Sequence, residues 1–140
     1  MEIKDSKFYR DKCYINGEWV NADSGETISV NNPANLKEIG TVPKCGTSET
    51  RNAIEAANNA WPEWRAKSAR QRSEILRKWF DLMIENKEEL AQIMTVEQGK
   101  PINESRGEIG YGASFVEWFS EEAKRLSLIH ISEPTRPVTI

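Results

Sequence analysis

The sequence changes character once, near residue 47, and this change limits the folds open to the chain. Before it, short apolar runs are separated by turn signals: Asn16-Gly17, Asp23-Ser24-Gly25 and Asn31-Asn32-Pro33. After it, apolar residues recur at spacings of three and four, which is typical of amphipathic helices. Strands therefore come first and helices follow, without the strand–helix–strand alternation that a parallel sheet requires.

The first part predicts a small β cap, with short strands near residues 13–42. Tyr14 to Val20 places two apolar pieces around Asn-Gly, the strongest two-residue hairpin signal. Thr27–Val30 alternates as a half-buried strand should, and Ile39–Pro43 predicts another short strand that proline ends. The first ten residues are polar and aperiodic, so we expect a loose end or an edge segment there.

The second part predicts four amphipathic helices, near residues 48–61, 69–85, 87–98 and 101–125. Thr47 or Ser48 is expected to cap the first helix, and Pro62 to end or kink it near Trp61. Capping boxes are predicted for the second helix (Ser68 with Gln71) and, more weakly, for the third (Asn86 with Glu89), with a stop and restart at Gly99 and Pro101. The predicted fold class is a mainly helical α+β fragment without a Rossmann-type sheet.

Composition excludes several classes of partner. The chain carries 19 Lys and Arg against 22 Asp and Glu, a formal net charge of −3, which disfavours nucleic acid and anionic membrane surfaces. No apolar run approaches the roughly 18 residues that a membrane span needs. Residues 1–5 lack the apolar stretch of a secretory signal. We therefore expect a cytoplasmic protein with neither a membrane nor a nucleic-acid partner.

The usual catalytic side chains are scarce. The single histidine, His130, lies in a tail interpreted below as non-native, so residues 1–125 lack Ser–His and Cys–His pairs and every His-containing metal site. Cys13 and Cys45 are too few for a disulfide scaffold or a four-thiolate site. We expect each to be a small, half-buried apolar residue. The sequence thus predicts no catalytic, cofactor-binding or metal-binding residue in this chain.

Three further patterns have structural explanations. Gly107, Gly110 and Gly112 reverse the spacing of the dinucleotide-binding fingerprint, so we expect them to let the last helix approach a neighbouring backbone. The pairs Glu88-Glu89 and Glu121-Glu122 are expected on solvated helix faces. The basic residues of the stretch 65–78 alternate with acidic ones, which disfavours a nucleic-acid patch.

An ordered set of landmarks runs from Cys13 to Arg125. Its members are Tyr14–Val20, Asn32-Pro33-Ala34, Ile39–Pro43, Ala56-Ala57, Ala60–Arg65, Arg72, Ile75-Leu76, Thr95–Pro101, Glu104 and Glu108. This set resembles the opening of an aldehyde dehydrogenase. Gln98 between Glu97 and Gly99, together with Ser114–Phe119, is most similar to the bacterial succinate-semialdehyde dehydrogenase branch.

The resemblance implies that residues 1–125 are the incomplete N-terminal part of a cofactor-binding domain, whose helices pack on a sheet encoded further along. The implied parent is a homo-oligomer that oxidises an aldehyde to the carboxylic acid, and succinate semialdehyde is the expected substrate. The reaction passes through a cysteine thioester, with NAD or NADP as the hydride acceptor. Its working residues, and those that select the aldehyde and the cofactor, come later in the chain. Cys13 and Cys45 lie in the wrong sequence context to be the family's nucleophilic cysteine, and Glu97 lies in the wrong context to be its general base. This chain alone is therefore expected to be inactive.

The last segment, residues 126–140, resembles no part of that family. Leu126 to Arg136 matches an in-frame translation of a transposase-type sequencing adapter, and residues 137–140 fit the index and codon that would follow. We therefore expect a non-native tail; the alternative is a short apolar strand with a proline-containing end.

Two interpretations of the whole chain follow. The first is an N-terminal fragment of an NAD(P)-dependent aldehyde dehydrogenase, cut short during gene assembly. The second is a genuine short, non-enzymatic helical module that docks on a dehydrogenase or another partner. The fourth helix carries Phe115, Trp118 and Phe119 on wide apolar faces, so the first interpretation also predicts unburied apolar surface.

Overall fold

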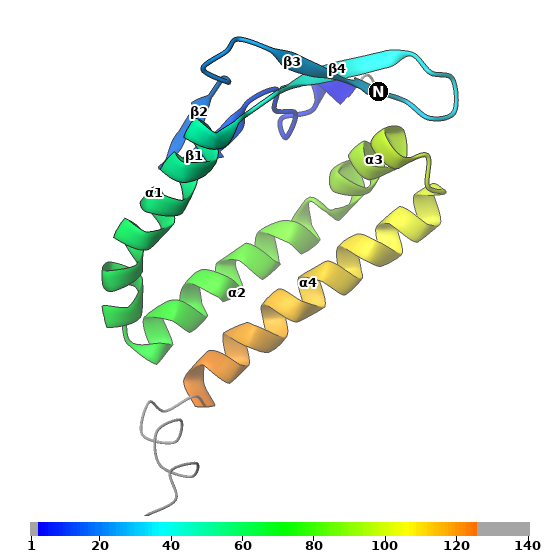
Figure 1. The fold of residues 1–140 in the computed structure, drawn as a ribbon. Helices are drawn as coiled ribbons and strands as arrows, with labels where there is room; N and C mark the ends of the chain where they lie inside the picture. The colour runs from blue at the N-terminus through cyan, green and yellow to red at the C-terminus, as the bar shows by residue number, and fades with distance from the viewer. Residues whose placement is uncertain (1–2, 126–140) are drawn as a thin grey trace, which may run out of the picture.

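The computed structural model describes residues 3–125, which form the mainly helical α+β fold that the sequence predicts (Figure 1). The predicted tail, residues 126–140, lies outside the described residues. Within residues 3–125 the elements are a 3-10 turn η1 (Ile3–Asp5), strands β1 (Cys13–Ile15), β2 (Glu18–Val20), β3 (Thr27–Asn31) and β4 (Glu38–Pro43), and helices α1 (Thr47–Ala66), α2 (Ala69–Glu85), α3 (Lys87–Gln98) and α4 (Ile102–Arg125).

The strands form two separate two-stranded antiparallel sheets, β1–β2 and β3–β4. In the first, Asn16 and Gly17 turn the chain with φ angles of 53° and 84°, the left-handed pair that a tight hairpin needs. The predicted hairpin is therefore confirmed. In the second, Thr27 pairs with Pro43, and the register shifts after Val30. Figure 1 shows β3 and β4 on one side of the helices, above α3.

One carboxylate fixes the start of α1. The sequence predicts Thr47 or Ser48 as the cap, but the cap is Gly46, whose N–H donates to the Glu49 carboxylate at 2.8 Å. The other oxygen of Glu49 accepts from the Asp23 N–H at 2.6 Å, and the residue is only 6% exposed. The hydrogen bond from Asp23, followed by those within the first helical turn, lowers the pKa of Glu49 from its ordinary value. Glu49 thus ties the turn before β3 to the helix.

Helix α1 continues through Pro62 to Ala66, so of the two predicted effects of Pro62 the end near Trp61 is wrong, and the kink stays a prediction. Proline has no N–H to donate to the carbonyl four residues earlier, that of Asn58. Asn58 is exposed, so solvent can satisfy its carbonyl and the helix does not have to end there.

Of the two predicted capping boxes, one forms. Ser68 Oγ accepts from the Gln71 N–H at 3.2 Å, and the Gln71 side-chain oxygen accepts from the Ser68 N–H at 2.8 Å. The box predicted for α3 is wrong, because Asn86 makes no side-chain cap bond. The Glu89 carboxylate instead accepts a hydrogen bond from Ser6 Oγ at 2.6 Å, so its partner is a residue distant in sequence and not the N–H of Asn86.

Within the described residues, the segment 3–7 is therefore not the loose end that the sequence predicts. Ser6 is 7% exposed and Ile3 is 6% exposed. The Lys7 N–H donates to the same Glu89 oxygen at 3.2 Å. This short segment is anchored to the start of α3 by one buried apolar residue and one carboxylate.

Helices α2 and α4 lie side by side and run in opposite directions (Figure 1). Their most buried positions hold small side chains: Ala113 and Ser120 of α4 are 0% exposed, and Ser73 of α2 is 5% exposed. Between α3 and α4, the hydroxyls of Thr95 and Ser105 lie 2.9 Å apart and share a hydrogen bond. Small side chains let helix axes approach closely, so the larger apolar groups lie along the flanks of the contact.

The end of α3 yields a test of this fold. Gly99 has φ 73°, as its predicted capping role requires, and a Cβ there would lie 2.8 Å from Pro33 Cγ. We expect Gly99→Ala to lower the free energy of unfolding by about 1–2 kcal/mol. Gly107, in α4, has no heavy atom within 4 Å of a built Cβ. The matched control Gly107→Ala should therefore raise the unfolding free energy by about 0.5–1 kcal/mol. Urea unfolding followed by circular dichroism measures both, and equal effects would contradict the assignment.

The Glu49 hydrogen bonds predict a pH dependence of stability. Because the pKa of Glu49 is lowered by folding, its contribution is present above the ordinary value of 4.5 and is lost as the pH falls through the folded pKa. We expect Glu49→Gln to lower the urea midpoint at neutral pH, and the gap from the unchanged chain to narrow below pH 4.5. Glu55→Gln, at an exposed position of α1, is the control. A gap that stays constant with pH would refute this role of the carboxylate.

Candidate functional site

The first predicted pair of adjacent carboxylates, Glu88 and Glu89, joins α3 to neighbouring elements. Glu88 accepts two hydrogen bonds from the Arg106 guanidinium, at 2.7 and 2.8 Å, which join α3 to α4. These bonds lower the pKa of Glu88. Glu89 is half-buried on Ser6 and Lys7, so its predicted solvated position is wrong. The two carboxylates have different partners and do not form an acid–base pair.

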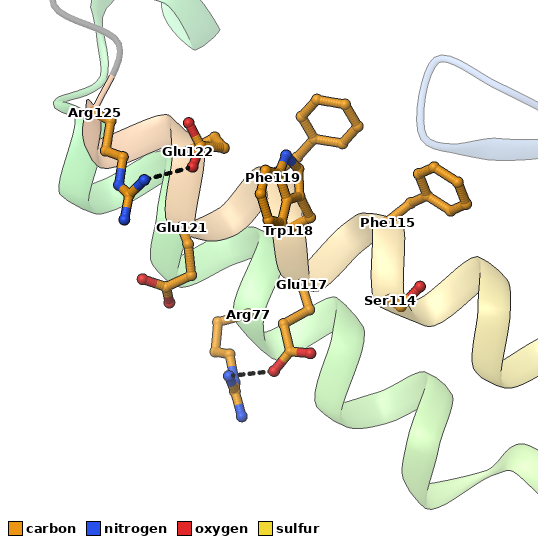
Figure 2. Close-up of a pocket in the computed structure, with 9 residues that line it drawn as sticks. All are labelled: Arg77, Ser114, Phe115, Glu117, Trp118, Phe119, Glu121, Glu122 and Arg125. Carbon is orange, nitrogen blue, oxygen red and sulfur yellow. Dashed lines mark hydrogen bonds and ion pairs between the residues drawn. The ribbon is translucent and has the colours of Figure 1, made fainter.

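The second pair, Glu121 and Glu122, lies near the end of α4. Glu121 is exposed, as predicted, but Glu122 is half-buried, so its predicted solvated position is wrong. Lys124 Nζ lies 2.8 Å from Glu121, within one turn of the helix. Arg125 lies 3.3 Å from Glu122, also within one turn (Figure 2). The hydrogen bond from Lys124 lowers the pKa of Glu121. These are surface ion pairs of the kind that contributes little to stability.

The three glycines of α4 form no phosphate cradle. They lie inside a continuous helix, where backbone N–H groups bond to carbonyls four residues earlier. A Cβ at Gly110 would lie 3.3 Å from Lys87 Nζ, and one at Gly112 would lie 3.9 Å from Met83 Cε. These atoms are the ends of flexible side chains, and no backbone atom of a neighbouring element lies within 4 Å of the built Cβ atoms. The predicted approach to a neighbouring backbone is therefore wrong.

The basic stretch of α1 and α2 is neutralised locally. Lys67 pairs with Glu63 at 2.7 Å and Arg70 with Glu74 at 2.8 Å. Arg72 donates to the backbone carbonyl of Lys67, where a cation favourably meets the end of α1. These partners account for the alternating charges in the sequence and leave no continuous cationic stripe along residues 63–74.

The cysteines have an arrangement that sequence reasoning missed. Cys13 Sγ and Cys45 Sγ lie 3.6 Å apart, and both residues are half-buried. The prediction of half-buried residues is confirmed for each, but the 32 positions between them gave no signal that they meet. Within residues 3–125, no group of three His, Cys, Asp or Glu side chains is placed to hold a metal ion. Glu97 lies exposed at the end of α3, apart from this pair.

A wide hollow lies on α4 beside α2 (Figure 2). It is open to solvent and has a volume of about 920 Å³, with Phe115, Trp118 and Phe119 forming its apolar wall. Arg77 of α2 reaches Glu117 of α4 at 3.1 Å across its other side. The lining holds aromatic rings and ion-paired carboxylates, without a Cys, His or Lys nucleophile. Its chemistry is that of a contact surface.

Beyond this hollow, both helices carry further exposed apolar side chains. On α4, Tyr111, Phe115, Trp118 and Phe119 recur at helical spacing and are 47–67% exposed. On α2, Ile75, Trp79 and Leu82 do the same and are 47–56% exposed. We call these seven residues the α2/α4 apolar face. No helix within the described range has the length and apolar character of a membrane span. The face is larger than the scattered apolar residues of an ordinary surface.

The burial of α4 residues predicts that replacing a large aromatic residue affects stability less than replacing a small buried one. Phe119 is 57% exposed, so Phe119→Gln should change the free energy of unfolding by less than about 0.5 kcal/mol. Ala113 is 0% exposed, so Ala113→Leu should lower it by about 1–3 kcal/mol through overpacking. Urea unfolding of the two variants decides the matter. A larger loss for Phe119→Gln would mean that the aromatic face is buried within the chain.

Comparison with known proteins gives consistent matches. The sequence profile of the Aldehyde dehydrogenase family matches residues 19–139. Glutarate-semialdehyde dehydrogenase from Pseudomonas putida strain KT2440 is 61% identical over 126 residues, which are 90% of this chain and 26% of that protein. Succinate-semialdehyde dehydrogenase (NADP(+)) GabD from Escherichia coli K12 is 56% identical over 126 residues, again 90% of this chain and 26% of that protein.

A solved structure agrees with the sequence matches. The crystal structure of succinate-semialdehyde dehydrogenase from Burkholderia pseudomallei has a TM-score of 0.85 to this chain at 55% identity, covering 89% of this chain and 26% of that one. The chain therefore spans about a quarter of the length of these relatives. The family profile extends over residues 126–139, which lie outside the described residues, and their interpretation as a non-native tail stays a prediction.

Proposed function

Because the chain belongs to the aldehyde dehydrogenase family, we propose that residues 1–125 are the opening part of the cofactor-binding domain of an NAD(P)-dependent semialdehyde dehydrogenase. The observation that carries this proposal is the 61% and 56% identity to two such enzymes over 126 residues each. Residues 126–140 are proposed as a non-native tail that contributes nothing to this role.

The proposed substrate of the whole enzyme is a short, linear aldehyde with a carboxylate at its far end, oxidised to the dicarboxylic acid. Succinate semialdehyde is our first choice, and glutarate semialdehyde differs from it by one methylene. One methylene in a pocket changes binding by only about 1–3 kcal/mol, so related enzymes of this kind separate the two substrates weakly.

The described residues do not themselves fit a nicotinamide dinucleotide. Gly107, Gly110 and Gly112 have their N–H groups committed inside α4, and the sheets of the described chain are two antiparallel pairs. A dinucleotide site of the ordinary kind needs a strand leading into a glycine-rich turn at the start of a helix. We therefore assign neither catalytic nor cofactor-binding residues to this chain, and we propose that it is inactive alone.

The contribution of this segment, on this proposal, is structural. Trp79 is 56% exposed and Trp118 is 63% exposed, and both belong to the α2/α4 apolar face. We propose that this face packs on the remainder of the cofactor-binding domain, as the family resemblance implies. The same face would serve the alternative, a short module that docks on a dehydrogenase or another partner.

A chimera tests the proposal. We expect residues 1–125, placed on the remaining part of the Pseudomonas putida relative in place of its own opening, to give an enzyme with kcat/KM within roughly tenfold of that relative, or about 1.4 kcal/mol of transition-state stabilisation. Aldehyde-dependent NAD(P)H formation with succinate and glutarate semialdehydes is the measurement. The same relative without any opening segment is the control and should be inactive.

The 140-residue chain is measured in the same assay and should form no NAD(P)H. Turnover by this chain that is lost in Cys45→Ser would contradict the proposal, since it would place a nucleophile within the chain. A soluble, sharply unfolding monomer combined with an inactive chimera would favour the docking module instead.

A further inference from the structure

The β cap holds a pair of thiols that the proposed function does not use. Cys13 is the first residue of β1, and Cys45 lies in the short loop between β4 and α1. Their sulfur atoms are 3.6 Å apart, which is van der Waals contact. The two cysteines are 32 positions apart in the sequence, so their contact is determined by the fold and not by the local sequence.

We propose that Cys13 and Cys45 form a reversible dithiol site that small-molecule disulfides, such as oxidised glutathione, convert to an intramolecular disulfide. The bond would join the β1–β2 hairpin covalently to the loop that leads into α1. Both residues are half-buried and not fully enclosed, so a small oxidant can reach the pair.

The geometry permits the bond with a small movement. A disulfide needs its sulfurs about 2 Å apart, so the two atoms must approach by roughly 1.5 Å. The hairpin can supply this movement because an open groove of about 340 Å³, lined by Tyr14–Gly17 on one side and by alanines of α1 on the other, separates it from the helix. A densely packed contact at this place would oppose the approach.

The reaction balances without any other reactant. The thiolate of one cysteine attacks a sulfur of the small disulfide, forms a mixed disulfide and releases one small thiol. The second cysteine, as its thiolate, then attacks the protein sulfur of the mixed disulfide and releases the second small thiol. The two protein thiols together lose two protons and two electrons, and the small disulfide gains them.

The surroundings of Cys45 slow its exchange with disulfides. Burial, the neighbouring Cys13 sulfur and the nearby Glu49 and Asp23 raise the pKa of the Cys45 thiol. A thiol that ionises reluctantly exchanges slowly, because the thiolate is the reacting form. Formation of the bond through Cys45 is therefore slow, and each sample must be left until the fraction of linked peptide no longer changes.

The test uses the unchanged 140-residue chain at low concentration, equilibrated with defined ratios of reduced to oxidised glutathione. After the free thiols are blocked, tryptic digestion and mass spectrometry report the products. Trypsin cleaves after Lys12 and Lys44, directly before each cysteine, so the linked peptides identify the bond unambiguously. The fraction of linked peptide gives the effective concentration of the two thiols.

We expect this effective concentration to be at least about tenfold higher in native buffer than in concentrated guanidinium chloride, where only chain flexibility brings the thiols together. Equal values would overturn the proposal, since the chain's own fold would not be holding the pair. A predominance of disulfide-linked dimers or of singly glutathionylated chain in native buffer would also overturn it.

Two variants assign the products. Cys13→Ser and Cys45→Ser should each yield only a glutathione adduct at the remaining cysteine, with no linked peptide. The comparison with guanidinium uses the unchanged sequence, so the test stands even where a variant unfolds. The urea midpoint of the unchanged chain should also rise on oxidation and return on reduction, because the cross-link constrains the unfolded state.

Discussion

The contact between α2 and α4 through small side chains is the constraint on which the rest of this structure depends. Ala113 and Ser120 are fully covered, so the two helices meet closely along these positions. Larger residues of the same helices are then displaced to the flanks, where Trp79 and Phe119 are more than half exposed. The apolar face is a geometric consequence of how the helices pair, since the surface that meets within the chain uses the smaller side chains.

In this acidic chain, carboxylates form the hydrogen bonds that join elements distant in sequence. Glu49 joins the turn at Asp23 to the start of α1, Glu89 joins the first residues to α3, and Glu88 joins α3 to α4 through Arg106. Each accepts at least two hydrogen bonds, whose donors are backbone N–H groups, the Ser6 hydroxyl and the Arg106 guanidinium. Hydrogen bonds to an ionised carboxylate are stronger than those between neutral groups. These contacts stabilise elements that bury little apolar surface.

Local sequence signals were sufficient to predict the helices, strands and turns, but they were insufficient to predict the contacts between these elements. Asn16-Gly17, Ser68 with Gln71, and Gly99 each act within a few residues, and each formed the predicted turn, cap or helix end. Pro62 and Glu89 were misjudged because solvent access and a distant serine decided their roles. The Cys13–Cys45 contact has no local signature at all, since its formation requires both sheets and the start of α1 to be placed first.

The same distinction explains how residues that pack within the chain can identify its family. The landmark Thr95–Pro101 is the junction between α3 and α4: Thr95 bonds to Ser105, Gly99 turns under Pro33, and Lys100 pairs with Glu108. Each of these residues contacts another part of the chain itself. The resemblance therefore rests on packing geometry that fixes how two helices meet. Such geometry is evidence for the fold of the parent, while the substrate must be argued from residues that contact it.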